Sequence, residues 1–258
     1  MSRKAALRAV PWPLLVGALS DAGRVRVANE DAFAVLPDDG LLIVSDGMGG
    51  HQAGATASRI VVDVLPAMIE QRLARAGDGR ASSPSRILRD AIVELSRQVR
   101  EQSAGRAGLS GMGATVVAVR LHGNRAYVAH MGDSRMYLHR QGRLSLLTHD
   151  HSLVALLLRR GEITPDQAKD HPARGKLSRY VGMETEVYPD IRAVHLVQGD
   201  RLLLCTDGLT GTVSEQEIAA ILGQPVEPES ACRSLIDAAN AAGGRDNITV
   251  LVADYTSG

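Results

Sequence analysis

The chain has 258 residues and no formal net charge, with 29 basic and 29 acidic side chains. This length fits one large domain or two small ones, and the neutral charge gives no general attraction to nucleic acid or to an anionic membrane. Aromatic residues make up only 3% of the chain, so the core must be built from aliphatic side chains, and a nucleic-acid groove is not expected.

The first 13 residues are predicted to form a loose N-terminal arm. They are basic and then apolar, but Pro11 and Pro13 interrupt the apolar stretch, which disfavours a signal peptide. No apolar run approaches membrane-spanning length. Cys205 lies in an apolar predicted strand and Cys232 in a predicted helix, and both are expected to be buried, reduced thiols. We therefore expect a cytoplasmic protein without a membrane partner.

The remaining residues alternate groups of short strands with helices. Apolar alternation and turn signals predict strands at residues 14–20, 32–36, 41–46, 114–121, 125–131, 134–140, 143–147, 191–196, 201–206 and 248–253. Helices are predicted at residues 53–75, 84–103, 152–160, 165–170, 214–222 and 228–242. Tight turns between consecutive strands favour antiparallel pairing. The pattern predicts an α+β fold, a four-layer αββα sandwich of two antiparallel sheets flanked by helix pairs. No linker is evident, so residues 14–258 are expected to be a single domain.

Two stretches of the chain are near-copies. Residues 41–47 (LLIVSDG) and 202–208 (LLLCTDG) are both aliphatic runs that end in Asp-Gly. The apolar run favours a buried strand, and the Asp stands where that strand leaves the core. The two copies therefore deliver Asp46 and Asp207 to the rim of a sheet.

Antiparallel pairing predicts which other acids reach this rim. A hairpin of residues 32–46 places Glu30 and Asp31 beside Asp46. If the last strand pairs with residues 201–206, Asp246 lies beside Asp207 in the same way.

A sixth acid, Asp133, is expected in the turn of a hairpin formed by residues 125–131 and 134–140. Gathered carboxylates repel one another unless a cation offsets their charge. Oxygen ligands without Cys or His at ligand spacing favour Mg²⁺ or Mn²⁺ over Zn²⁺. Alternatively, each Asp is only a turn former or a helix cap, but this alternative is weak for all of them at one rim.

Six motifs then carry a family resemblance. They are residues 26–31 (RVANED), 45–51 (SDGMGGH), 111–115 (GMGAT), 132–135 (GDSR), 206–209 (TDGL) and 245–249 (RDNIT). The chain resembles the metal-dependent serine/threonine protein phosphatases of the PPM (type 2C) family, in its bacterial branch, over about residues 16–253. The resemblance implies an αββα sandwich with a metal centre at one edge.

The same resemblance implies a role for each acid. Asp46 would bridge two Mn²⁺ or Mg²⁺ ions. The Gly47 carbonyl and Glu30 would complete one site, and Asp207 and Asp246 would complete the other.

Further residues would assist these ions. Asp31 would hold a metal-bound water, and Asp133 would bind a possible third ion. Arg26 would bind the substrate phosphate. Eukaryotic relatives have a histidine where this chain has Met48, whose thioether cannot donate a proton. We therefore expect that the general acid, which donates a proton to the leaving group, is a metal-bound water rather than His51.

The implied reaction is hydrolysis of phosphoserine and phosphothreonine by a metal-bridging water, without a phosphoenzyme. The catalytic residues would be Arg26, Asp46 and Asp207. The partners implied are phosphorylated proteins, with a cognate protein kinase or its substrates, and we expect a monomer. Two alternatives are a weak or inactive phosphoprotein-binding regulator of the same fold, and a hydrolase of a small phosphomonoester or of nucleic acid.

The resemblance also implies that residues 149–188 form a flap beside the metal centre. Four basic residues in the polar stretch 161–188, namely Lys169, Arg174, Lys176 and Arg179, lead us to expect that the flap contacts the substrate around the phosphate. At its start, His149 and His151 alternate in a way that suggests a second metal site. We favour a different interpretation, in which Asp150 caps the helix that begins near Ser152 and both histidines are partly exposed.

Overall fold

The computed structural model describes residues 12–76, 83–105, 108–109 and 111–256. The predicted N-terminal arm lies almost entirely outside these residues. Among the described residues, no helix is both long enough and apolar enough to cross a membrane.

The secondary structure follows the predicted order closely. The strands are β1 (Leu14–Asp21), β2 (Ala32–Leu36), β3 (Leu41–Ser45), β4 (Gly47–Met48), β5 (Gly113–Ala114), β6 (Val116–His122), β7 (Arg125–Met131), β8 (Arg135–Arg140), β9 (Arg143–Leu146), β10 (Asp190–His195), β11 (Arg201–Cys205) and β12 (Ile248–Tyr255). The helices are α1 (His51–Ala76), α2 (Pro84–Ser103), α3 (Leu153–Arg159), α4 (Pro165–Lys169), α5 (Asp207–Thr210), α6 (Glu215–Leu222) and α7 (Pro228–Ala241).

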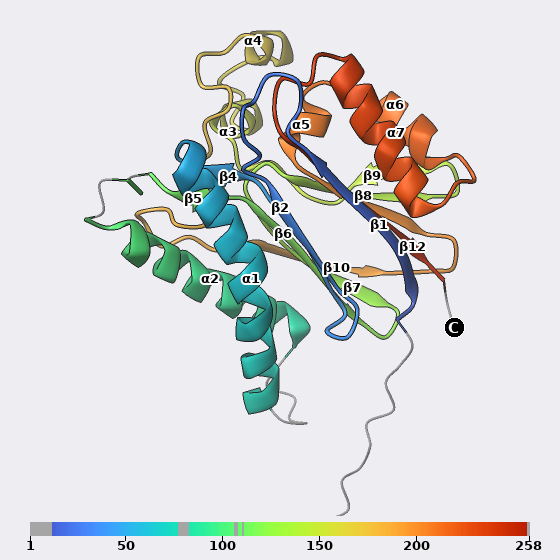
Figure 1. Ribbon diagram of the computed structural model, residues 1–258, viewed down its shortest axis with the longest axis horizontal. Coiled ribbons are helices and arrows are strands. Elements are labelled where there is room, and N and C mark those ends of the chain that lie inside the picture. Colours follow the sequence, from blue (N-terminus) through green and yellow to red (C-terminus); the bar gives the residue numbers. More distant parts are fainter. Residues whose placement is uncertain (1–11, 77–82, 106–107, 110, 257–258) are drawn as a thin grey trace, which may run out of the picture.

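The elements form a four-layer sandwich (Figure 1). One five-stranded sheet has the order β1-β12-β11-β8-β9 and the other has the order β10-β7-β6-β3-β2. Every strand pair in both sheets is antiparallel. Helices α1 and α2 cover the second sheet, and α6 and α7 cover the first. The predicted αββα fold is confirmed.

Strand β3 shows how its sequence fixes its place between two cores. All five of its residues are buried. Leu41 and Ile43 pack in the core under α1 and α2, whereas Leu42 and Val44 point into the core between the sheets. A continuous aliphatic run suits a strand that is covered on both faces.

The predicted hairpin of residues 125–131 and 134–140 is wrong. Strand β7 pairs with β6 and β10, whereas β8 pairs with β11 and β9, so the chain crosses between the sheets at residues 132–134. Gly132 permits this crossing because it has φ 114° and packs against Thr115, where a Cβ would clash. The short pair β4–β5 and the helix α5 were not predicted.

Candidate metal centre

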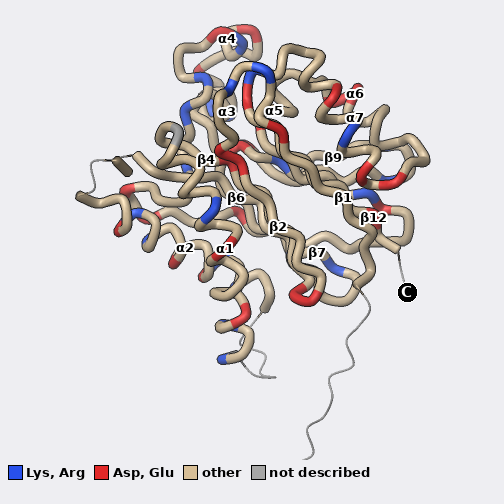
Figure 2. Tube along the Cα trace, viewed as in Figure 1, with Lys and Arg blue, Asp and Glu red and all other residues tan. Residues whose placement is uncertain are grey.

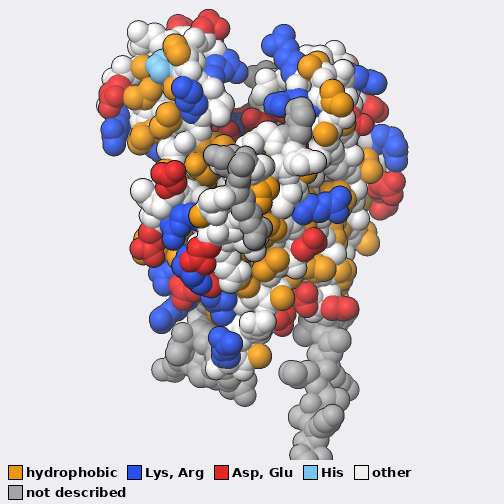
Figure 3. All heavy atoms as spheres, turned by 60° about the vertical axis from the view of Figure 1, so that its left-hand side comes forward, with side chains coloured by type: hydrophobic (Ala, Val, Ile, Leu, Met, Phe, Trp, Pro, Cys, Tyr) orange, Lys and Arg blue, Asp and Glu red, His pale blue; other side chains and the backbone are white. Residues whose placement is uncertain are grey.

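Five of the six predicted acidic residues line one pocket at an end of the two sheets, and Asp31 is not among its lining residues. Figure 2 shows acidic residues gathered at the ends of the strands near β4 and α5, and Figure 3 shows a hollow with acidic side chains in it and basic ones around it. The pocket is lined by Arg26, Glu30, Asp46, Gly47, Met48, Gly49, Gly50, Thr115, Asp133, Gly175, Leu177, Asp207, Asp246 and Asn247. The sequence therefore predicted where these acids meet, even though its pairing of β7 with β8 was wrong.

Asp46 follows β3 and is held through its backbone. Its N–H donates to Thr115 Oγ1 at 2.9 Å, and its carbonyl accepts the Thr115 N–H at 2.8 Å. The β2–β3 hairpin pairs Ala32 with Ser45, so the residues before β2 lie beside Asp46, as predicted. These bonds orient the backbone of Asp46 while its carboxylate faces the pocket.

Asp207 and Asp246 come from the other sheet. Strand β11 pairs antiparallel with β12, and beyond the last pair the Thr206 N–H donates to the Thr249 carbonyl at 3.0 Å. Asp207 therefore begins α5 beside the residues that precede β12. Arg26 Nη2 donates to Asp246 Oδ2 at 2.8 Å. Arg26, the residue expected to bind the substrate phosphate, therefore lies at the same rim.

Asp133 reaches the pocket because the chain changes sheets there. Ser134, the next residue, shares a hydroxyl hydrogen bond of 2.6 Å with Thr115 Oγ1. Thr115 thus ties the Asp133 loop to Asp46. Asp133 follows β7 and Asp46 follows β3, two strands of the same sheet, and Thr115 positions the two residues together.

Glu30 enters the pocket through a space that two glycines leave open. A Cβ on Gly54 would collide with the Glu30 carboxylate, and one on Gly47 would collide with the Gly54 backbone. The Glu30 carbonyl accepts a 2.5 Å hydrogen bond from Ser58 Oγ. The side chain is therefore directed inward and is only 8% exposed.

Asn247 is a residue whose role the sequence analysis missed. Its side-chain oxygen accepts the Glu30 N–H at 2.9 Å, and its amide nitrogen donates to the carbonyls of Ala22 and Ala28 at 3.0 and 2.9 Å. It therefore clamps the loop that carries Arg26 and Glu30 onto the start of β12. Its only sequence signal was its place directly after Asp246.

The electrostatics of the pocket are unfavourable for bare carboxylates. Burial is the main cause that raises the pKa of Asp31 to about 7 and that of Asp133 to about 8. Burial also raises the pKa of Asp46 and Asp207. Neighbouring carboxylates raise all four pKa values further. The pocket therefore concentrates negative charge where water screens it poorly.

The donor set fits hard divalent cations. It consists of carboxylates and backbone carbonyls, which Mg²⁺ and Mn²⁺ prefer. One oxygen, Asp31 Oδ1, is buried and has no hydrogen-bond partner among the described residues. In the described part of the chain, no three of these acids have ligand oxygens that all lie within 4.8 Å of one another.

The predictions for residues 149–152 need correction. Asp150 does not cap a helix: it accepts two hydrogen bonds, of 2.8 and 2.7 Å, from Arg135. Ser152 caps α3 by accepting the Ala155 N–H. His149 is exposed, but His151 is fully buried. The side chain of His51 lies outside the described residues.

Comparisons with known proteins agree with the motifs. A family model described as protein phosphatase 2C matches residues 24–239. A serine/threonine phosphatase, stp, from Listeria welshimeri is 39% identical over 238 residues, covering 91% of this chain and 93% of the relative. The structure of the S. agalactiae serine/threonine phosphatase has a TM-score of 0.80 at 33% identity, covering 93% of this chain and 99% of the other. The catalytic domain of the phosphatase PstP, in complex with two manganese ions, has a TM-score of 0.77 at 36% identity, covering 93% and 97%.

Proposed function

Because the chain belongs to the protein phosphatase 2C family, we propose that it is a Mn²⁺- or Mg²⁺-dependent phosphatase of phosphoserine and phosphothreonine in proteins. The observation that carries this proposal is the pocket lined by five carboxylates with Arg26 at its rim. Such a pocket suits cations and, through them, a phosphate dianion. The Listeria relative and the manganese complex of PstP support both the reaction and the metal.

In this proposal the two sheets each supply half of a metal centre. Asp46 would bridge two ions, with Glu30 and the Gly47 carbonyl on one side and Asp207 and Asp246 on the other. When bound, a pair of such ions lowers the pKa of a water and screens the charge of the phosphate. Asp133 would hold a further ion.

The chain's own side chains have complementary tasks. Arg26 is half-exposed, so its guanidinium can turn from Asp246 toward two phosphate oxygens. Asp31, whose Oδ2 accepts a hydrogen bond from Thr206, is placed to hold a water at the metals. Met48 lines the pocket but has no proton to donate.

The pocket also favours direct attack by water. Thr115 is the one hydroxyl residue among the described residues that line it. Its oxygen is already engaged by the Asp46 N–H and by Ser134. No hydroxyl of this lining is therefore free to act as the nucleophile.

We extend the proposal to the flap and to the partners. Gly175 and Leu177 line the acidic pocket, and Arg174 lines a second cavity with Asp207 and Asp246. Residues 149–188 are therefore placed to contact a protein substrate around its phosphate. We propose that residues 14–258 act as one domain, as a monomer, on the products of a cognate protein kinase.

The decisive test is hydrolysis of a phosphothreonine peptide with Mn²⁺ and with EDTA. We expect activity only with the metal, and a fall in kcat of at least about 100-fold in Asp207→Asn. Asp237→Asn is the control, because Asp237 is exposed on α7. Full activity in EDTA or in Asp207→Asn would overturn the proposal. Phosphopeptide binding without turnover would instead favour a phosphoprotein-binding regulator.

A further inference from the structure

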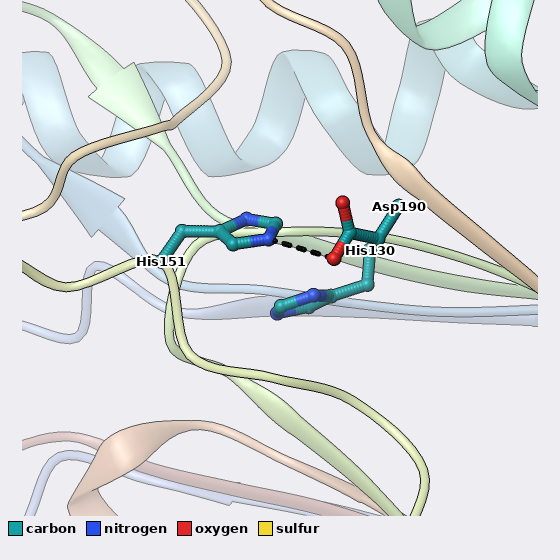
Figure 4. Close-up of side chains that lie close together, drawn as sticks. All are labelled: His130, His151 and Asp190. Atoms are coloured by element: carbon teal, nitrogen blue, oxygen red, sulfur yellow. Dashed lines mark hydrogen bonds and ion pairs between the residues drawn. The ribbon is translucent and has the colours of Figure 1, made fainter. Parts of the chain in front are cut away.

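A group of two histidines and an aspartate stands outside the residues that line the acidic pocket, and Figure 4 shows how the three side chains lie. His130 comes from β7, His151 from the segment after β9, and Asp190 from the start of β10. His151 and His130 are buried, and Asp190 is half-exposed. The proposed reaction uses none of the three.

The hydrogen bonds of His151 define its tautomer. The Gly132 N–H donates to Nδ1 at 3.2 Å, so Nδ1 carries no proton. The proton is therefore on Nε2, which lies 3.2 Å from Asp190 Oδ2 and donates to it. The ring is thus a fixed bridge with an acceptor at one end and a donor at the other.

One end of this bridge is the loop that carries Asp133. Besides the ring contact, the backbone N–H of His151 donates to the Gly132 carbonyl at 2.8 Å. Gly132 thus gives both of its backbone polar groups to His151. Because Asp133 is the next residue, its carboxylate is positioned by this pair of bonds.

The other end of the bridge is a later part of the flap, at residues 178–179. The Ser178 N–H and Oγ both donate to the His151 carbonyl, at 2.6 and 2.9 Å. Arg179 donates to Asp190 Oδ1 at 2.8 Å, while Oδ2 of the same carboxylate receives the His151 proton. Two consecutive flap residues therefore depend on His151 and its aspartate.

These bonds disfavour a second metal site, although the three side chains offer ligand atoms within 4.8 Å of one another. Both ring nitrogens of His151 and both oxygens of Asp190 are already engaged, and a cation would have to approach beside the Arg179 guanidinium. Of the two histidines in this group, only His130 has buried ring nitrogens without a hydrogen-bond partner among the described residues. Its ring packs against that of His151 with a centroid distance of 4.6 Å.

We propose that His151 is a positioning residue that couples the flap to the Asp133 loop, so that substrate contacts and metal binding support each other. The inference rests on the proposed function, because it assigns the flap to the substrate and Asp133 to an ion. Coupling between two sites requires an element that both of them bias. His151 is that element, since its ring and its backbone N–H bond to Gly132. Its carbonyl accepts two hydrogen bonds from Ser178, and its ring is linked to Arg179 through Asp190.

Two substitutions separate the ends of the bridge. In His151→Asn the amide oxygen can replace Nδ1 as the acceptor for Gly132, but the side chain is too short to reach Asp190. In His151→Gln the amide nitrogen can replace Nε2 as the donor, but the acceptor for Gly132 is lost. The control is His122→Asn, on the exposed end of β6.

The two variants are expected to fail differently. His151→Gln should raise the Mn²⁺ concentration for half-maximal activity about tenfold on both a phosphopeptide and a small aryl phosphate. His151→Asn should leave the Mn²⁺ requirement and the aryl phosphate kinetics unchanged, and raise KM for the phosphopeptide about tenfold. Asp190→Asn should behave like His151→Asn. Equal losses in both variants, or none, would overturn the coupling.

Hydrogen exchange tests the coupling without relying on activity. In the wild-type protein, Mn²⁺ should slow exchange in residues 149–188. In His151→Asn this effect should disappear from the flap, while residues 132–134 stay protected. A flap that still responds to Mn²⁺ in both variants would refute the inference. A wild-type protein that binds no Mn²⁺ would instead refute the proposed function.

Discussion

The acidic pocket makes a quantitative prediction about the stability of the metal-free protein. Burial and the nearby Asp207 raise the pKa of Asp133 to about 8, from an ordinary value of 3.8. A carboxyl whose pKa is raised on folding costs no stability below its unfolded pKa, and its cost grows as the pH rises from that value to about 8. Relative to a neutral side chain, Asp133 therefore costs about 4 kcal/mol at pH 7 and about 2 kcal/mol at pH 5.

Replacing Asp133 by Asn should thus stabilise the protein in EDTA. Part of this gain in stability is lost, because the amide introduced by Asp133→Asn is a polar group with imperfect hydrogen bonds in this pocket, which costs about 1–3 kcal/mol. A net gain of about 2 kcal/mol at pH 7 corresponds to a Tm higher by about 4–8 °C. The gain should grow from about pH 5 to about pH 8, since the loss of stability due to Asp133 itself occurs only in the wild-type protein.

The assay is thermal unfolding of both proteins across this pH range, in EDTA and then with saturating Mn²⁺. Added Mn²⁺ should stabilise the wild-type protein by mass action. The stabilisation should be smaller in Asp133→Asn, because this variant lacks a proposed metal ligand. Asp237→Asn is the control, because it removes one exposed charge from the same chain. A difference in Tm that is absent, or that narrows as the pH rises, would refute the electrostatic argument.

Three further predictions concern the residues that shape the pocket. Arg26→Lys should lower kcat/KM on a phosphopeptide by about 10–100-fold, because an ammonium cannot hold two phosphate oxygens in the same plane; equal kcat/KM values would contradict this. Asn247→Ala removes three hydrogen bonds to the loop before β2, and should lower the free energy of unfolding in urea by about 2–4 kcal/mol. Gly54→Ala should weaken Mn²⁺ binding in calorimetry about tenfold, since its Cβ would displace Glu30. Gly108→Ala, in open space, should bind Mn²⁺ normally.

The acids could be located from the sequence because strand pairing is a local rule. Asp46 and Asp207 each end an aliphatic run, and such runs become buried strands. Once the antiparallel partners were known, the ends that carry Glu30 and Asp246 had to lie beside them. The six motifs then pointed to the family, which the matching relatives confirm.

The crossing between the sheets could not be predicted in the same way. A Gly-Asp pair between two short strands is typical of a hairpin turn, and nothing local distinguishes that turn from a step to another sheet. The choice depends on packing, since the crossing places Gly132 directly against Thr115. Asp133 lies at the predicted rim, but it is placed there by the crossing between the sheets and not by the predicted hairpin.

The burial of His151 is a similar case. A histidine between an acid and a serine, at the start of a polar stretch, indicates an exposed turn. The structure buries it completely because its ring and backbone bond to Gly132, Ser178 and Asp190, from three separate segments. Such partners are far apart in the chain, and a local pattern contains no record of them.

The position of the metal centre follows from the joint between the two sheets. Asp46 leaves one sheet, and Asp207 leaves the other. The separation of these sheets is set by aliphatic side chains packed between them, among them Val44 and Leu204. Because interiors are close-packed, a change of even one methylene there shifts the sheets or leaves a cavity. The core between the sheets therefore fixes the distance between the two halves of the centre, and the same packing energy opposes the repulsion of the acids it brings together.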